Sequence, residues 1–206
     1  MSLRALLAEV HPAWHGAGDG GLDPALLRRA CDSALGRRLL ATALAAGPAS
    51  HLLAPSPDGP GALIARWSRA RLDALHRDLG VLAYAPAIRA EIGREPVRRL
   101  KAALGSSYLL ALDRSVWDAK VEPEIQVRLA EDLRHALSAA DGTTTLLLTF
   151  ALQGRAELQA WASHRDPALA QWARLLEAPE ALPPAHLPEK PVLVVQTHHQ
   201  NRAVAA

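Results

Sequence analysis

The fold class is decided by the stretch from Glu122 to Gly142, which reads EPEIQVRLAEDLRHALSAADG. An acidic residue followed by proline opens it, and a glycine closes it, as is typical of the two ends of a helix. Its apolar residues recur every four positions, a spacing that puts them on one face of a helix: Ile125, Leu129, Leu133 and Leu137. The spacing therefore predicts a helix over 123–140.

The same signals recur along the chain and divide it into helices. Acidic residues precede prolines again at Asp23, Glu95 and Asp166, and glycines follow apolar-periodic runs at Gly80 and Gly105. The further helices predicted in this way cover 24–46, 61–79, 81–92, 96–104, 107–114, 144–153, 155–163 and 167–178. Residues 143–150 hold four threonines and three leucines, which could also form a strand. Since no partner strand is evident nearby, helix is favoured there.

Composition predicts an all-α fold. Ala, Leu and Arg number 42, 36 and 20 of the 206 residues, against only 10 Val, 4 Ile and 6 Thr, so the β-branched residues of a large sheet are missing. The single cysteine, Cys31, cannot close an intrachain disulfide, which favours a reducing compartment. No apolar run approaches the ~20 residues of a membrane span, and the first residues do not read as a secretory signal. We therefore expect a cytoplasmic protein.

The chain is expected to form one compact multi-helix domain with two less ordered ends. Residues 1–22, rich in glycine, predict a flexible segment, and residues 23–178 predict the helical domain, with a proline-rich loop over 47–60. Five prolines between 179 and 191 predict an extended tail over 179–206. Within it, residues 192–195 could add as a strand to a sheet, although a disordered tail is favoured.

Signatures of catalysis and of cofactor or metal binding are missing or lack their context. Gly16, Gly18 and Gly21 match the dinucleotide-binding pattern, but no strand precedes them. His11 and His15 have the spacing of two metal ligands on a helix, yet Pro12 and the glycines argue for a loop with solvent-facing histidines. The sequence also has no nucleophile elbow, phosphate loop or zinc-protease motif. We expect no catalytic residues, no cofactor, no metal and no enzymatic activity.

One stretch remains as a candidate binding site. Residues 89–101 carry five basic side chains against two acidic ones, the largest local excess in a chain whose net charge is only +2. Phosphate contact is one interpretation, but no aromatic residues are interleaved for base stacking. A solvated helix face, with Glu95 paired to Arg99, is another. The partner-binding candidates, for an acidic protein surface, are Arg94, Arg98 and Arg99.

The middle of the chain resembles a known family. The segments are LHRDLG at 75–80, IRAEI at 88–92 and VRRLKAALG at 97–105, and the last leads to Tyr108 and further leucines. Together with the later Trp161, Pro167 and residues 174–176, they resemble the K-type subunit of type III secretion systems, the Ysc/Psc K family with its Hrp counterparts in plant-associated bacteria. The resemblance covers about half of the chain and leaves residues before 60 unaligned.

The resemblance implies a virulence-associated protein of a sorting platform beneath the injectisome. Such a subunit is a largely helical, non-enzymatic cytoplasmic adaptor, peripheral to the inner-membrane secretion apparatus. It joins the forkhead-associated-type cytoplasmic domain of the inner-membrane ring protein to the C-ring-like platform protein that carries the export ATPase. Neither nucleic acid nor membrane insertion is implied. The alternatives are a helical nucleic-acid-binding regulator, favoured by the arginines and a pI near 9.0, and a small helical enzyme.

Overall fold

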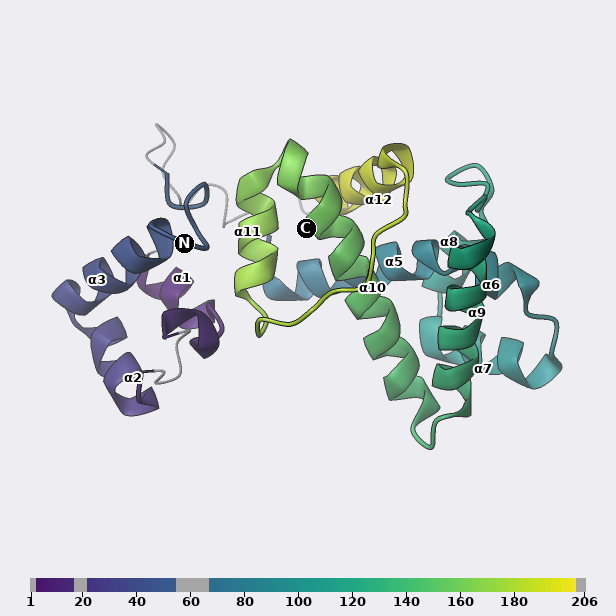
Figure 1. Cartoon of the computed structure of the whole chain (residues 1–206), viewed down its shortest axis with the longest axis horizontal. Helices are drawn as coiled ribbons and strands as arrows, with labels where there is room; N and C mark the ends of the chain where they lie inside the picture. The colour runs from purple at the N-terminus through teal and green to yellow at the C-terminus, as the bar shows by residue number, and fades with distance from the viewer. Residues whose placement is uncertain (1–2, 17–21, 55–66, 203–206) are drawn as a thin grey trace. The chain divides into compact units, whose positions relative to one another are not determined.

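The computed structural model describes residues 3–16, 22–54 and 67–202, and all regular structure within these ranges is helical (Figure 1). The predicted all-α class is confirmed. The α-helices are α1 (Leu3–Glu9), α2 (Pro24–Asp32), α3 (Ala34–Ala45), α5 (Arg69–Ala83), α6 (Ala85–Ala90), α7 (Arg94–Leu104), α8 (Ser107–Leu112), α9 (Pro123–Ser138), α10 (Gly142–Arg165), α11 (Pro167–Leu175) and α12 (Glu189–Arg202). A 3₁₀ helix, η1, spans Pro12–His15.

The chain forms two compact units, each built from two separate segments. Unit 1 comprises residues 1–72 and 162–181, and unit 2 comprises residues 73–161 and 182–206. A single helical domain over 23–178 was expected from the sequence, which gives no linker between the two. Several residues that the sequence singles out, including Gly18, Gly21 and the end of the loop expected over 47–60, lie outside the described residues.

In unit 1, the helix expected over 24–46 is divided in two. Asp23 caps α2 as predicted, because its Oδ1 accepts hydrogen bonds from the backbone N–H groups of Ala25 and Leu26. Ser33 then adopts an extended conformation and caps α3, with its Oγ accepting from the Gly36 N–H at 2.9 Å. The break arises because a serine side chain can satisfy a new helix start better than it supports a helix interior.

The core of unit 1 joins the start of the chain to α11. Trp172 is buried, and its indole Nε1 donates to the Trp67 carbonyl at 3.0 Å. The Gln171 side-chain oxygen accepts from the N–H groups of His51 and Leu52, both at 2.9 Å. Residues 3–9, expected within a flexible segment, form α1, because leucines at positions 6 and 7 are buried in this core.

In unit 2, α5 and α10 make a close contact through glycines. A Cβ added at Gly80 would lie 1.8 Å from the Phe150 oxygen, and one added at Gly154 would lie 1.7 Å from the His76 oxygen. Gly80 was predicted to end a helix, but α5 continues to Ala83. The glycine is there because the two backbones approach too closely for any side chain.

Residues 143–150 are helical, as favoured over a strand, and the two helices expected over 144–153 and 155–163 are one continuous helix, α10. The threonine hydroxyls fit this helix because Thr145 donates to the Asp141 carbonyl and Thr149 to the Thr145 carbonyl, each one turn back. This bonding within the helix satisfies polar groups that would otherwise favour a strand or turn.

The extended proline-rich tail expected over 179–206 is not confirmed. Residues 189–202 form α12, in which Val192 and Val195 are buried. Pro191 lies in the first turn of this helix, where the lack of a backbone N–H costs nothing. The preceding residues 182–188 belong to unit 2 without forming a helix themselves. The helix predicted over 61–79 begins at residues that lie outside the described ones, and within the described residues its helix, α5, starts at Arg69. The predicted boundaries of the remaining helices differ mainly by a few residues at their ends.

His76 in α5 is expected to make the stability of the protein sensitive to acid. Burial, assisted by the charge of Arg155, lowers the pKa of His76 to about 3. Below pH 6.5, the ordinary pKa of histidine, the unfolded chain takes up a proton on His76 that the folded chain does not. The free energy of unfolding therefore falls as pH falls. The contribution is about 2 kcal/mol between pH 7 and pH 5. Urea unfolding at both pH values measures it.

The His76→Gln variant should show a shallower loss of stability between pH 7 and pH 5 than the wild type. Comparing slopes makes the test independent of any overall loss of stability in the variant. His135→Gln, at an exposed position of α9, is the control and should keep the wild-type slope. An unchanged slope in His76→Gln would contradict the prediction.

Candidate functional site

Helix α7 presents basic side chains along its solvent face. Arg94, Arg98 and Lys101 are exposed and follow one another at intervals of four and three residues, which places them on the same face. Leu100 and Leu104 are buried on the other side of the helix. Because the leucines fix the rotation of α7, the basic residues are held toward solvent.

Glu95 neutralises part of this basic face. Its Oε1 accepts from Arg98 Nη2 at 2.9 Å and from Arg99 Nε at 3.3 Å. These hydrogen bonds lower the pKa of the Glu95 carboxyl, so it stays ionised at neutral pH. All three groups are well exposed to water, and such ion pairs contribute little to stability. The pairing of Glu95 with Arg99, expected from their spacing, is confirmed.

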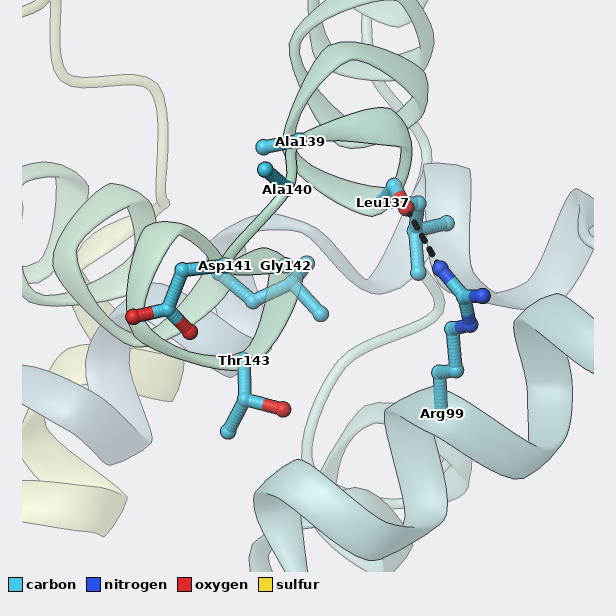
Figure 2. A pocket seen from close by; sticks show the side chains of 8 residues that line it. Arg99, Leu137, Ala139, Ala140, Asp141, Gly142 and Thr143 are labelled. Atoms are coloured by element: carbon cyan, nitrogen blue, oxygen red, sulfur yellow. Dashed lines mark hydrogen bonds between the residues drawn. The ribbon is translucent and has the colours of Figure 1, made fainter.

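Arg99 also has a role inside unit 2. Its Nη1 donates to the Leu137 carbonyl at 3.0 Å, near the end of α9. Figure 2 shows this bond at one wall of a pocket of about 260 Å³, with Asp141 on the other side. Asp141 Oδ1 accepts from the Thr144 N–H at the start of α10. Of the three candidates named from the sequence, Arg94 and Arg98 face solvent, whereas Arg99 is partly engaged with α9.

Arg89, the first residue of the basic stretch, is not part of this solvent face. Its guanidinium donates to four backbone carbonyls, those of Ala111, Asp113, Trp117 and Asp118, at 2.6–3.4 Å. Burial lowers the pKa of Arg89, with a further contribution from the nearby charge of Arg114. Its role is to hold the turn after α8, which no sequence spacing indicates.

Exposed apolar side chains lie on α8 and just before α7. Ile92 is 94% exposed, Leu109 66% and Leu112 42%. Lys101 Nζ lies 5.6 Å from the centre of the Tyr108 ring, so the basic face of α7 adjoins α8. We call the six residues together the α7–α8 surface: Ile92, Arg94, Arg98, Lys101, Leu109 and Leu112. An exposed apolar patch that is rimmed by polar residues is typical of a surface that binds another protein.

Comparison with known proteins adds no family. No protein-family model matches the chain, and neither the curated proteins nor the solved structures include a significant match. In the described part of the chain, no helix is both long enough and apolar enough to cross a membrane. The function therefore has to be inferred from the residues of the chain itself.

One partly buried polar cluster in unit 2 brings together a serine, an aspartate and a histidine. Ser107 Oγ on α8 donates to Asp78 Oδ1 on α5 at 2.6 Å, and His199 Nε2 on α12 lies 2.8 Å from Asp78 Oδ2. Burial tends to raise the pKa of Asp78, but the hydrogen bonds from His199 and Ser107 outweigh it and lower that pKa. Both partners thus bind the same carboxylate, and the cluster joins three helices rather than pairing a serine nucleophile with a base.

A second buried cluster holds the segment before α12. The Glu157 side chain of α10 is only 2% exposed and accepts from the backbone N–H groups of His186 and Leu187 at 2.9–3.1 Å. Gln153 Nε2 donates both to Glu157 Oε1 and to the Pro184 carbonyl. The His186 ring completes the cluster, since its Nε2 donates to the Ala83 carbonyl at 3.1 Å. These groups fasten residues 184–187 to α5 and α10.

The histidines considered as metal ligands have separate roles in unit 1. The His11 ring accepts from the Ala13 N–H and caps η1, whereas His15 Nε2 donates to the Leu7 carbonyl. Both line an open pocket of about 550 Å³, together with Cys31. Burial raises the pKa of the Cys31 thiol, an effect opposite to activation. No group of three metal-binding side chains occurs within the described ranges.

Proposed function

We propose that this protein is a non-enzymatic helical adaptor of a type III secretion sorting platform. The observation that carries the proposal is the α7–α8 surface, which combines exposed apolar side chains with basic ones. Such a surface suits a partner that presents apolar side chains within an acidic surround. Its partners would be the cytoplasmic forkhead-associated-type domain of the inner-membrane ring protein and the C-ring-like platform protein.

The resemblance to the K-type subunits supports this function. The segments that resemble the family, around residues 75–80, 88–92 and 97–105, form α5, the end of α6 and α7, all of which contribute buried residues to unit 2. The α7–α8 surface lies on the same part of the chain. An adaptor of this kind would work in the cytoplasm, at the periphery of the inner-membrane apparatus.

The two polar clusters of unit 2 agree with a structural rather than a catalytic protein. Ser107 and His199 are both directed at the Asp78 carboxylate, and Glu157 binds backbone N–H groups. Each cluster connects helices to one another or to residues 184–187. Nucleic acid, the alternative ligand, is disfavoured at α7, since Glu95 lies between the arginines and Tyr108 beside Lys101 is buried rather than available for stacking.

The double variant Arg94→Glu with Arg98→Glu is expected to bind its platform partner at least tenfold more weakly. The two substitutions place glutamates against the acidic surface of the partner, which repels them. A tenfold change in Kd corresponds to about 1.4 kcal/mol of binding free energy. The test is isothermal titration of the full chain with the purified platform protein and, separately, with the cytoplasmic domain of the ring protein. Circular dichroism should show unchanged helicity, because both side chains are exposed.

A matched control reverses two exposed charges elsewhere in unit 2, Arg134→Glu with Lys190→Glu, and should leave binding unchanged. Equal affinity of wild type and the Arg94/Arg98 variant would remove α7 from the interface. Failure of the wild type to bind either protein would overturn the adaptor function. Tight, strongly salt-dependent binding of a DNA duplex, lost in the same variant, would favour the nucleic-acid regulator instead.

A further inference from the structure

Helix α3 in unit 1 carries exposed leucines as well as buried ones. Leu40 and Leu44 are buried, whereas Leu35 and Leu39, on the opposite side, are 67% and 63% exposed. Exposed apolar side chains that lie next to one another can mark a site where another protein binds. In unit 1, within the described residues, only one side of α3 is covered.

The exposed side forms a continuous stripe along the helix. Leu35, Leu39, Thr42 and Ala46 follow at intervals of four, three and four residues, so they lie in one line, and all are exposed. The Thr42 hydroxyl donates to the Arg38 carbonyl of its own helix at 2.8 Å, which removes its need for an outside partner. We call these four residues the α3 face. Its two leucines are followed by two small side chains, a profile suited to an apposed helix.

Covering this face would bring a substantial gain. Burying a leucine side chain is favourable because it removes apolar surface from water. Leu35 and Leu39 are each about two-thirds exposed, and they project from a helix whose rotation is fixed by the buried Leu40 and Leu44. A partner would therefore meet a preformed apolar stripe that needs little reordering.

The charges of α2 and α3 favour one kind of partner for the α3 face. α3 contains two arginines and no acidic residue, and Arg28, Arg29 and Arg38 are all exposed on α2 and α3. The two acidic groups of this region are already engaged, since Asp23 caps α2 and Asp32 pairs with Arg4 at 2.7 Å. A second copy would oppose arginine to arginine, whereas an acidic partner would complement them.

We propose that the α3 face binds an acidic amphipathic helix of a partner protein, with the partner's apolar side chains against Leu35 and Leu39 and its carboxylates toward Arg28, Arg29 and Arg38. This surface goes beyond the proposed function, because it belongs to unit 1 and the α7–α8 surface belongs to unit 2. It gives the protein a second docking site that depends on neither the secretion partners nor α7.

A synthetic helical peptide tests the proposal on the full chain. The probe is a fluorescein-labelled peptide of about three heptads with leucine at positions a and d and glutamate at e and g, and its counterpart carries lysine in place of glutamate. Fluorescence anisotropy should show binding of the acidic peptide and none of the basic one. Leu35→Ser with Leu39→Ser should raise the Kd at least tenfold. Val127→Ser with Leu148→Ser, at similarly exposed positions of unit 2, should leave it unchanged.

Each other result would overturn the proposal. Two such results are that the acidic peptide does not bind the wild type, and that it binds the Leu35/Leu39 variant with the same Kd as the wild type. Loss of binding in the Arg94/Arg98 variant instead would move the peptide to the α7–α8 surface. If light scattering showed that the wild type is a dimer and the Leu35/Leu39 variant a monomer, the α3 face would bind a second copy of the chain instead. If the protein bound phosphatidylglycerol vesicles through Leu35 and Leu39 but did not bind the peptide, the α3 face would bind a membrane instead. None of these results affects the titration of the secretion partners.

Discussion

Gly154→Ala is expected to lower the free energy of unfolding by about 3 kcal/mol or more. The added Cβ would lie 1.7 Å from the His76 oxygen and 2.8 Å from the Gly80 nitrogen, both backbone atoms of α5. No rotation of a side chain can relieve such a contact, so one of the two helices must shift. Urea unfolding monitored by circular dichroism measures the loss.

The sign of the change in unfolding free energy tells whether packing or helix propensity dominates at Gly154. Replacing glycine by alanine within an exposed helix would stabilise it by about 1 kcal/mol. Gly142→Ala, at the first residue of the same helix, is the control, because its Cβ would lie 3.4 Å from the nearest atom. It should change stability by less than about 0.5 kcal/mol. Stabilisation by Gly154→Ala would show that α5 and α10 are not in contact at this point.

Glu157→Ala is expected to cost about 3 kcal/mol and to loosen residues 184–187. Removing the carboxylate leaves the backbone N–H groups of His186 and Leu187 without their acceptor inside the protein. Buried donors without partners cost about 1–3 kcal/mol each. Hydrogen exchange should show faster exchange of the amides at 186 and 187 than at residues within α10.

Two further variants make the Glu157 test specific. Glu131→Ala removes an exposed carboxyl group from α9 and should leave both stability and exchange unchanged. Glu157→Gln retains one side-chain oxygen and should fall between the wild type and the alanine variant. Wild-type exchange at residues 186 and 187 in Glu157→Ala would contradict the role assigned to the carboxylate.

The sequence predicts the helices better than it predicts what joins them. Apolar spacing and capping residues identify α9 and the start of α2 because these signals act within a few residues. Pro191 misleads because it lies in the first turn of α12, where proline is tolerated, and Gly80 misleads because tertiary packing overrides its local meaning as a helix breaker. The tail prediction is not confirmed for the same reason: the acceptor for residues 186 and 187 is Glu157, about thirty positions earlier.

The candidate surface could be located from the sequence but not resolved into its parts. The excess of basic residues over 89–101 indicates α7 and its neighbours. Local charge cannot show that Arg89 binds four carbonyls or that Arg99 reaches the end of α9, because those acceptors are distant in sequence. Helical spacing places Lys101 on the same exposed face of α7 as Arg94 and Arg98. The exposure of Ile92 and Leu109 cannot be predicted in this way, because it depends on how the helices pack.

The division of each unit into two segments has a consequence for synthesis on the ribosome. Unit 1 needs residues 162–181 in addition to its first 72, and unit 2 needs residues 182–206. At elongation rates of about 5–20 residues per second, roughly 5 to 20 seconds separate the emergence of the two parts of unit 1. During that interval the segments that form α1, α2 and α3 have no α11 to pack against. A premature stop after Trp161 would therefore leave both units unfinished.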